Sequence, residues 1–134
     1  MFAAMLFAIS IVALSQFALY YWRAVVAGVA AQPVSHRVLE AAHVEGDSLS
    51  AKDFETLAGL HDLTPDLQPE RGGLSLVRLY FRAIGTIEVV LGGSIPSVAA
   101  WGQRERAICA RYAAVLIDRR LQANLELAAS LRSC

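Results

Sequence analysis

Two histidines and a glutamate stand at a spacing that could bind a metal ion. His36, Glu40 and His43 occupy positions i, i+4 and i+7, which lie on one face of an α-helix. Glu40 and His43 form a Glu-x-x-His pair, the unit that carboxylate-bridged dimetal bundles use twice. Residues 44–134 contain no second copy of this pair. We therefore expect these residues to form a polar helix surface rather than a metal site, and we predict no bound cofactor.

Other catalytic patterns find little support. The sequence has no G-x-S-x-G, no P-loop and no G-x-G-x-x-G. Gly92-Gly93-Ser94 precedes a predicted helix and could hold an anion, although a glycine-rich turn between packed helices is the commoner use of such a stretch. Cys109 lies in an apolar helical pattern and is predicted to be a core residue, whereas Cys134 is predicted to be an exposed thiol. We predict that the protein is not an enzyme.

The N-terminus has the length and composition of a membrane anchor. Phe2–Trp22 carries no charged side chain, and a helix of this length spans ~31 Å, close to the ~30 Å of a bilayer core. Tyr20, Tyr21 and Trp22 form an aromatic end, and Arg23 follows directly. A cleaved signal peptide is the alternative, but no basic residue precedes the apolar run, and the run is longer than such peptides require. We predict a retained single-pass helix with the lipid bilayer as its first partner.

The flanking charges and one polar residue extend this prediction. Arg23 and Arg37 follow the apolar run and no basic residue precedes it, which places the C-terminal part in the cytoplasm, below a cell inner membrane. Gln16 lies within the span, where a lipid-facing amide would lack a partner. It is predicted to contact another membrane helix, with snorkelling toward the interface as the alternative. The excess of Arg over Lys is typical of a GC-rich bacterial genome.

The rest of the chain is predicted to be helical throughout, so the fold class is all-α. Residues 1–31 form the anchor helix and its extension, and residues 32–73 form acidic short helices and a loop. A short helix is expected over Val34–His43. A second is expected over Ala51–Leu60, with Ser50 and Asp53 as a near capping box. Residues 61–73 read as a loop because they contain two prolines and a glycine pair.

Residues 74–134 are predicted to form a long antiparallel helix hairpin. Its helices cover Leu74–Leu91 and about Val98–Leu131, joined by a short turn that contains Gly and Pro. Ala83–Trp101 carries Glu88 as its only charge and could touch the membrane. A glutamate at the centre of a bilayer costs ~2.5 kcal/mol or more, so burial in the core or at an interface is the favoured interpretation.

Charge is divided along the chain although the net charge is zero. Residues 38–70 are acidic and residues 71–134 are rich in Arg, so the acidic segment is expected to fold back on the basic helices. A balanced charge excludes a general attraction for nucleic acid, and we predict none as a partner. The alternative is a basic face for a partner or for anionic lipid, made by Arg78, Arg82, Arg104, Arg111, Arg119 and Arg120.

These features favour a non-catalytic, single-pass accessory or structural subunit of a larger membrane protein complex. The alternative is a membrane-tethered binding or regulatory module that uses the basic face. A small metalloprotein built on the His36 face is the third hypothesis.

Overall fold

The computed structural model describes residues 1–41, 49–65 and 73–133. These ranges hold five helices and no strand, which confirms the predicted all-α class. The helices are α1 (Phe2–Ala30), α2 (His36–Ala41), α3 (Asp53–Leu63), α4 (Gly73–Leu91) and α5 (Pro96–Arg132).

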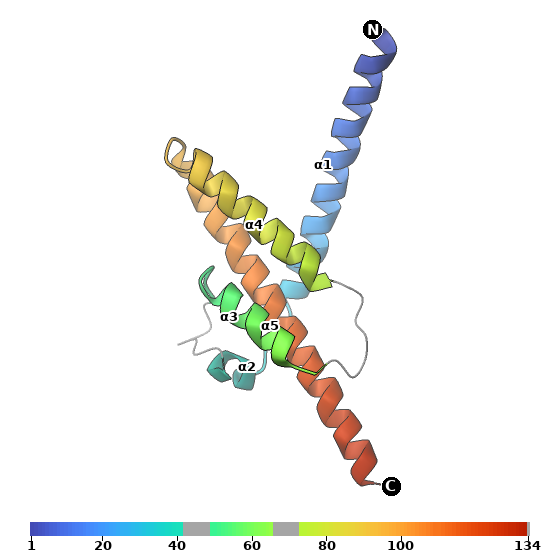
Figure 1. Cartoon of the computed structure of the whole chain (residues 1–134), viewed down its shortest axis with the longest axis vertical. Coiled ribbons are helices and arrows are strands. Elements are labelled where there is room, and N and C mark those ends of the chain that lie inside the picture. The colour runs from blue at the N-terminus through green and yellow to red at the C-terminus, as the bar shows by residue number, and fades with distance from the viewer. Residues whose placement is uncertain (42–48, 66–72, 134) are drawn as a thin grey trace.

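The long helix α5 is the axis of the molecule. Each of the other four helices contacts it. Figure 1 shows α4 lying along the first half of α5 in the opposite direction, α3 beside its middle, and the last turns of α1 leaning against it. The C-terminal turns of α5 project beyond the body, at the opposite end from the N-terminus. The small domain is therefore a single layer of helices wrapped around one central helix.

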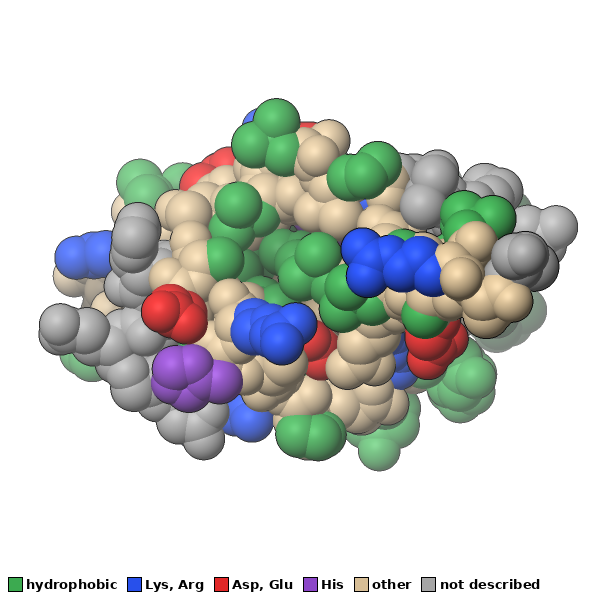
Figure 2. Space-filling model, turned by 90° about the horizontal axis from the view of Figure 1, so that it is seen from below, with side chains coloured by type: hydrophobic (Ala, Val, Ile, Leu, Met, Phe, Trp, Pro, Cys, Tyr) green, Lys and Arg blue, Asp and Glu red, His purple; other side chains and the backbone are tan. Residues whose placement is uncertain are grey.

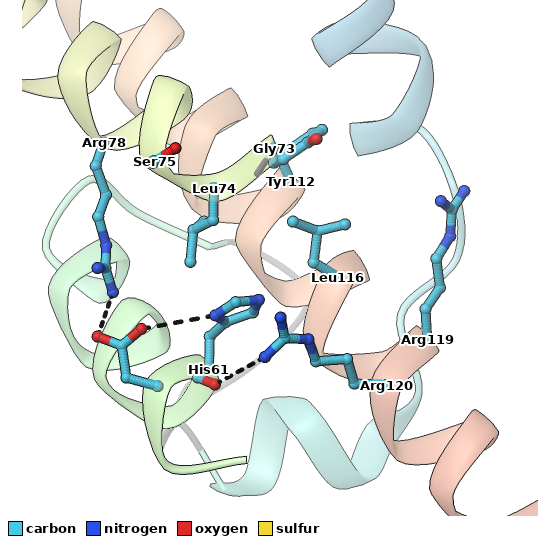
Figure 3. A pocket seen from close by; sticks show the side chains of 10 residues that line it. His61, Gly73, Leu74, Ser75, Arg78, Tyr112, Leu116, Arg119 and Arg120 are labelled. Carbon is cyan, nitrogen blue, oxygen red and sulfur yellow. Dashed lines mark hydrogen bonds and ion pairs between the residues drawn. The ribbon is translucent and has the colours of Figure 1, made fainter. Parts of the chain in front are cut away.

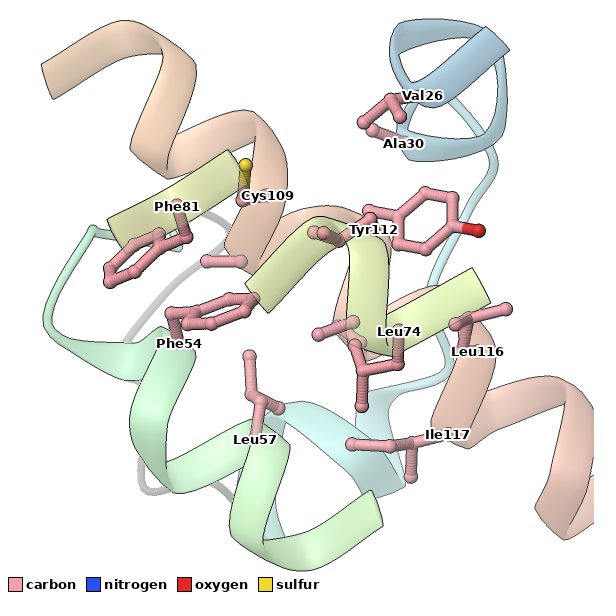
Figure 4. Packing of buried hydrophobic residues seen from close by; sticks show 14 of the residues in the cluster. Val26, Ala30, Phe54, Leu57, Leu74, Phe81, Cys109, Tyr112, Leu116 and Ile117 are labelled. Carbon is pink, nitrogen blue, oxygen red and sulfur yellow. The ribbon is translucent and has the colours of Figure 1, made fainter. Parts of the chain in front are cut away.

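The core lies where these helices meet the middle of α5. Residues 109–117 of α5 are buried except Arg111, and they include three alanines that let neighbouring helices come close. Phe54 of α3 and Phe81 of α4 stack with their ring centroids 4.1 Å apart. Leu57 and Leu74 fill the space below them, as Figure 4 shows. Full burial of side chains of this size contributes ~1.5–3 kcal/mol each, so this cluster holds the domain together.

Helix α1 has two parts: an exposed part up to Tyr21, called the bare part below, and a C-terminal part that packs against the other helices. Among the described residues, α1 is the one helix that is long and apolar enough to cross a membrane. Its most apolar stretch of 18 residues contains no buried residue. Val26 and Ala30 near its C-terminal end belong to the core, and Trp22 and Val29 pack against it. The anchor candidate and the helical body therefore share one hydrophobic core.

Several helix ends differ from the sequence-based prediction by one to three residues; α2, for example, begins at His36 instead of Val34. Asp53 accepts hydrogen bonds from the backbone amide and the hydroxyl of Ser50. The N-cap of α3 is nevertheless Lys52, without a side-chain capping hydrogen bond, so the predicted cap at Ser50 is wrong and the helix begins two residues later than expected. Helix α3 also continues to Leu63, three residues past its predicted end. It stops where Thr64 adopts an extended conformation (ψ 121°), because Pro65 disfavours a helical residue before it. The predicted start of the loop at His61 is wrong, and His61 and Asp62 lie in the last turn of α3.

The turn between α4 and α5 is tight and closed by backbone hydrogen bonds. The amide of Gly92 donates to Glu88 at 2.8 Å, and the amides of Ser94 and Ile95 donate to Leu91 at 3.1 and 2.9 Å. Helix α5 then begins at Pro96, two residues before its predicted start, because proline suits the first helical position.

Candidate functional site

A buried carboxylate of α5 binds side chains of both α1 and α4. Glu105 of α5 is buried, with 6% of its surface exposed. Arg23 of α1 donates a charge-assisted hydrogen bond to one of its oxygens, and the hydroxyl of Tyr80 on α4 donates to the other at 3.0 Å. The guanidinium of Arg23 also lies 6.0 Å from the ring centroid of Trp101. We call these four residues the anchor contact.

The anchor contact is stabilised by charge neutralisation. A carboxylate held in a buried place needs a cation or several donors, because its hydration is lost there. Arg23 supplies the cation and Tyr80 a second donor. Burial, and then the hydrogen bond to Glu105, raise the pKa of Tyr80, so its hydroxyl stays protonated and can act as the donor. The contact therefore fastens the end of the apolar helix to the body.

A second cluster surrounds His61 at the end of α3. Arg78 of α4 lies 2.6 Å from Asp62 and donates to the carbonyl of Ala58 at 2.9 Å. Arg120 of α5 donates to the carbonyl of His61 at 3.3 Å. Figure 3 shows these side chains around a hollow of about 430 Å³, which Arg119 also lines.

Burial and charge set the protonation of this cluster. Loss of solvent, and then the nearby charge of Arg120, hold the pKa of His61 below its usual 6.5, so the imidazole is neutral at neutral pH. Asp62 accepts a hydrogen bond from Arg78, which lowers the pKa of its carboxyl below 3.8. Asp62 is the one carboxylate among the described lining residues, beside three arginines. The hollow can therefore attract a small anion.

The predicted metal-binding residues are only partly described. His36 and Glu40 lie on α2, exposed, with the Nδ1 atom of His36 3.9 Å from a carboxylate oxygen of Glu40. His43 lies outside the described residues. Over the described ranges, no three His, Cys, Asp or Glu residues come together as a possible metal site.

The predicted basic face is divided among several contacts. Arg78 and Arg120 belong to the His61 cluster, and Arg119 donates to the side chain of Gln32 at 2.7 Å. Arg82, Arg104 and Arg111 are exposed, and within the described ranges none of them forms an ion pair. Seen from the end opposite to the N-terminus, basic side chains alternate with acidic and apolar ones (Figure 2).

The predicted anchor residues take different positions. Phe2, Gln16, Tyr20 and Tyr21 are exposed along the bare part of α1. Trp22, which was predicted to lie among headgroups, is half-buried and packs against the core. The bare part of α1 ends at the anchor contact, where Arg23 follows.

Sequence reasoning missed the residues that complete the anchor contact. Glu105 and Arg23 are 82 positions apart, so no local pattern pairs them. One local feature could have drawn attention to Glu105: it stands one helical turn after Trp101, on a predicted helix whose other charges are mostly Arg. A second buried carboxylate, Asp118, accepts from the hydroxyl of Ser35 and was missed for the same reason.

Searches of protein-family models, curated protein sequences and solved structures found no match to this chain.

Proposed function

We propose that this protein is a non-catalytic, single-pass subunit of a membrane protein assembly, with its helical body held against the membrane surface as an accessory or structural element. The observation that carries this proposal is the construction of α1. Its last turns are part of the core, through Val26 and Ala30, while its most apolar stretch is bare.

The bare part of α1 requires an apolar environment. Contiguous exposed apolar surface of this size is rare on soluble monomers and marks an interaction site. A helix of 29 residues with a charge-free run of 21 has the length for a bilayer. Its Gln16, exposed on the same helix, would be satisfied by a polar residue of a neighbouring membrane helix.

The rigid joint favours a structural role over a loose tether. A tethered binding module is joined to its anchor by a flexible linker, which lets the module sample many orientations until it meets a partner. Here α1 runs to Ala30 without a break, and Arg23 is fastened to Glu105. The body therefore keeps one orientation to the bilayer, as a subunit that docks at a defined place requires. The charges of Arg23 and Arg37 favour a body on the cytoplasmic side of the inner membrane of a bacterium.

The C-terminal turns of α5, from Leu121 onward, offer the docking surface for protein partners. They project away from the body, opposite to the N-terminus (Figure 1). Large apolar side chains are exposed along them, namely Leu121, Leu125, Leu127 and Leu131. An amphipathic helix of this kind typically lays its apolar side into a groove of a partner.

Blue-native electrophoresis of membranes solubilised in mild detergent tests the proposal. We expect the protein to migrate in a band of much higher mass than the chain itself. Leu125→Glu should release it from that band, because a charge at an apolar contact leaves an unpaired ion. Ser130→Glu, an exposed position on the same helix, is the matched control and should retain it. Migration of the unaltered protein as a free monomer would contradict the proposal.

The hollow beside His61 supports a second candidate function, a membrane-tethered module that binds an anionic partner. The supporting observation is the presence of Arg78, Arg119 and Arg120 around one opening. Inorganic phosphate should then raise the unfolding temperature at low salt, and Arg119→Gln should abolish the effect. A shift that is indifferent to ionic strength would argue against arginine-driven binding.

A further inference from the structure

We infer that residues 87–98, the turn between α4 and α5 with the adjoining helix ends, insert into a lipid bilayer. The leaflet concerned is the one that faces the helical body. We call residues 87–98 the α4–α5 tip. The inference rests on the proposed membrane anchoring of α1 and adds a second lipid contact, which would fix the tilt and rotation of the body.

The α4–α5 tip is apolar and unpartnered. Val89 and Val90 are 83% and 68% exposed, and Leu91 and Ile95 are both 44% exposed. No charged residue occurs from residue 89 to residue 103. The two helix ends and the turn thus form an exposed apolar patch. Patches of this kind mark sites that contact another molecule or a membrane.

The position of the α4–α5 tip indicates that the cover is lipid. The anchor contact places Arg23 of α1 level with Tyr80 on α4 and Glu105 on α5. From that level the bare part of α1 and the α4–α5 tip extend to the same side of the body, while the C-terminus lies on the other (Figure 1). A bilayer that receives α1 is therefore on the side to which the tip points.

Aromatic and basic residues gather at the level where the exposed apolar surface begins. Tyr20 and Tyr21 are exposed just before Arg23, and Trp101 lies beneath its guanidinium. Arg82 follows Tyr80 by two residues and Arg104 precedes Glu105 by one, and both are exposed. Tyr, Trp and Arg are side chains that favour the headgroup layer. The layer at the anchor contact thus matches the membrane surface.

The single carboxylate of the tip is neutralised inside the molecule. Glu88 pairs with Arg106 at 3.1 Å, and both side chains are largely shielded from solvent. Gly102 lets α5 pass close by, since a Cβ atom there would lie 3.3 Å from the Glu88 carboxylate. Arg106 in turn lies over the ring of Phe81, 4.6 Å from its centroid. Glu88 therefore does not present a bare charge to lipid.

The outer face of α4 has a shape that fits an acyl chain. An open hollow of about 600 Å³ runs along it, lined by Gly85, Thr86, Val89 and Val90, with Arg82 among its charged lining residues. An apolar trough with an exposed guanidinium suits a lipid whose phosphate meets Arg82. The turn itself tolerates an apolar surrounding because three of its amides are hydrogen-bonded within the turn.

The reach of the tip limits the depth of insertion. Residues 81–91 of α4 extend ~16 Å beyond Tyr80 at 1.5 Å per residue, and α4 is oblique to α1 in Figure 1. Interfacial helices bury their apolar side ~5–10 Å deep. The tip therefore reaches the boundary of headgroups and acyl chains and does not span the bilayer.

Fluorescence of single labels in the full-length protein tests this inference. A Cys134→Ser background receives Leu14→Cys on α1, Val90→Cys at the tip or Leu131→Cys near the end of α5. The three native side chains are similarly exposed, at 73%, 68% and 71%. Each variant is labelled with an environment-sensitive dye and placed in nanodiscs of phosphatidylcholine and phosphatidylglycerol, whose two faces are both open to solvent. Cys109 is buried and is not labelled.

We expect the Leu14 and Val90 labels to emit at shorter wavelength, to be quenched by lipids that carry bromine on their acyl chains, and to be protected from iodide. Iodide should quench the Leu131 label severalfold more strongly. A Val90 label as accessible to iodide as the Leu131 label, beside a protected Leu14 label, would overturn the inference and leave the anchor intact. A Leu14 label that is itself open to iodide would overturn the proposed anchoring.

Discussion

Arg23 and Glu105 show how single charges tie helix α1 to the body. Glu105 is buried while Arg23 is half-exposed, so the two side chains do not contribute equally. Loss of Arg23 leaves the buried carboxylate of Glu105 without a cation to replace its lost hydration, whereas loss of both charges leaves no unpaired buried ion. The energetic importance of the pair thus lies in the penalty for breaking it from one side.

A double-mutant cycle measures this asymmetry. Arg23→Gln should lower the free energy of unfolding by ~2 kcal/mol, because Glu105 keeps only Tyr80 as a donor. Addition of Glu105→Gln should recover part of that loss, so the two substitutions should not be additive. Denaturant titration in mild detergent gives the values. Arg104→Gln, at an exposed arginine without an ion pair in the described ranges, should change little.

His61 makes the stability of the body sensitive to mild acid. Its folded pKa lies below its usual 6.5, so below that pH the unfolded chain takes up a proton that the folded protein resists. The stability that the neutral His61 contributes is therefore fully present above pH 6.5 and is lost as the pH falls through the folded pKa. Thermal unfolding between pH 7.5 and pH 5 should show this decline.

The matched variants separate His61 from the other histidines. His61→Gln should flatten the decline even if it lowers stability at every pH. His36→Gln, at an exposed position, should leave the decline as it is in the unaltered protein. An equal slope for His61→Gln and the unaltered protein would contradict the assignment.

At the scale of the element, α4 and α5 depend on the glycine that ends α4. A Cβ atom at Gly92 would lie 2.3 Å from the carbonyl oxygen of Glu88, a backbone atom that cannot move without opening the turn. The same atom at Gly93 would meet nothing within 4 Å. The two neighbouring glycines are therefore not equivalent.

Gly92→Ala should lower the free energy of unfolding by more than ~1 kcal/mol, because the native backbone cannot accept the methyl group. Gly93→Ala should be close to neutral. Calorimetry of both variants under one set of conditions provides the measurement, and equal effects would show that the turn relaxes freely.

Across the whole molecule, the junction of α1 with α5 determines whether the apolar helix and the body act as one unit. Val26 is buried in the core, whereas its neighbour Val25 points away and is 43% exposed. A charge at the buried position should separate the two parts without altering the apolar run before it.

Limited proteolysis in mild detergent tests this coupling. Val26→Asp should expose residues 31–35 and speed their cleavage severalfold, because a buried unpaired carboxylate drives the joint apart. Val25→Asp places the same charge one residue earlier and should leave the cleavage rate unchanged. Similar rates for both variants would indicate that α1 is only loosely attached.

The sequence by itself determined the features that depend on neighbouring residues. The run from Phe2 to Trp22 predicted the long apolar helix, since its signal is composition over one segment. Ser50 with Asp53 indicated a helix start two residues before that of α3, and proline and glycine marked the breaks, because caps and turns involve residues a few positions apart. Even there, the end of α3 was misplaced.

Only the tertiary structure decided which distant residues meet. It joined Arg23 to Glu105 and set Arg106 against Glu88, a carboxylate that by sequence alone argued against lipid contact at the tip. It also buried His61, which the sequence had placed in a loop. These outcomes depend on how the helices pack around α5, and packing brings together side chains whose separation along the chain carries no periodic signal.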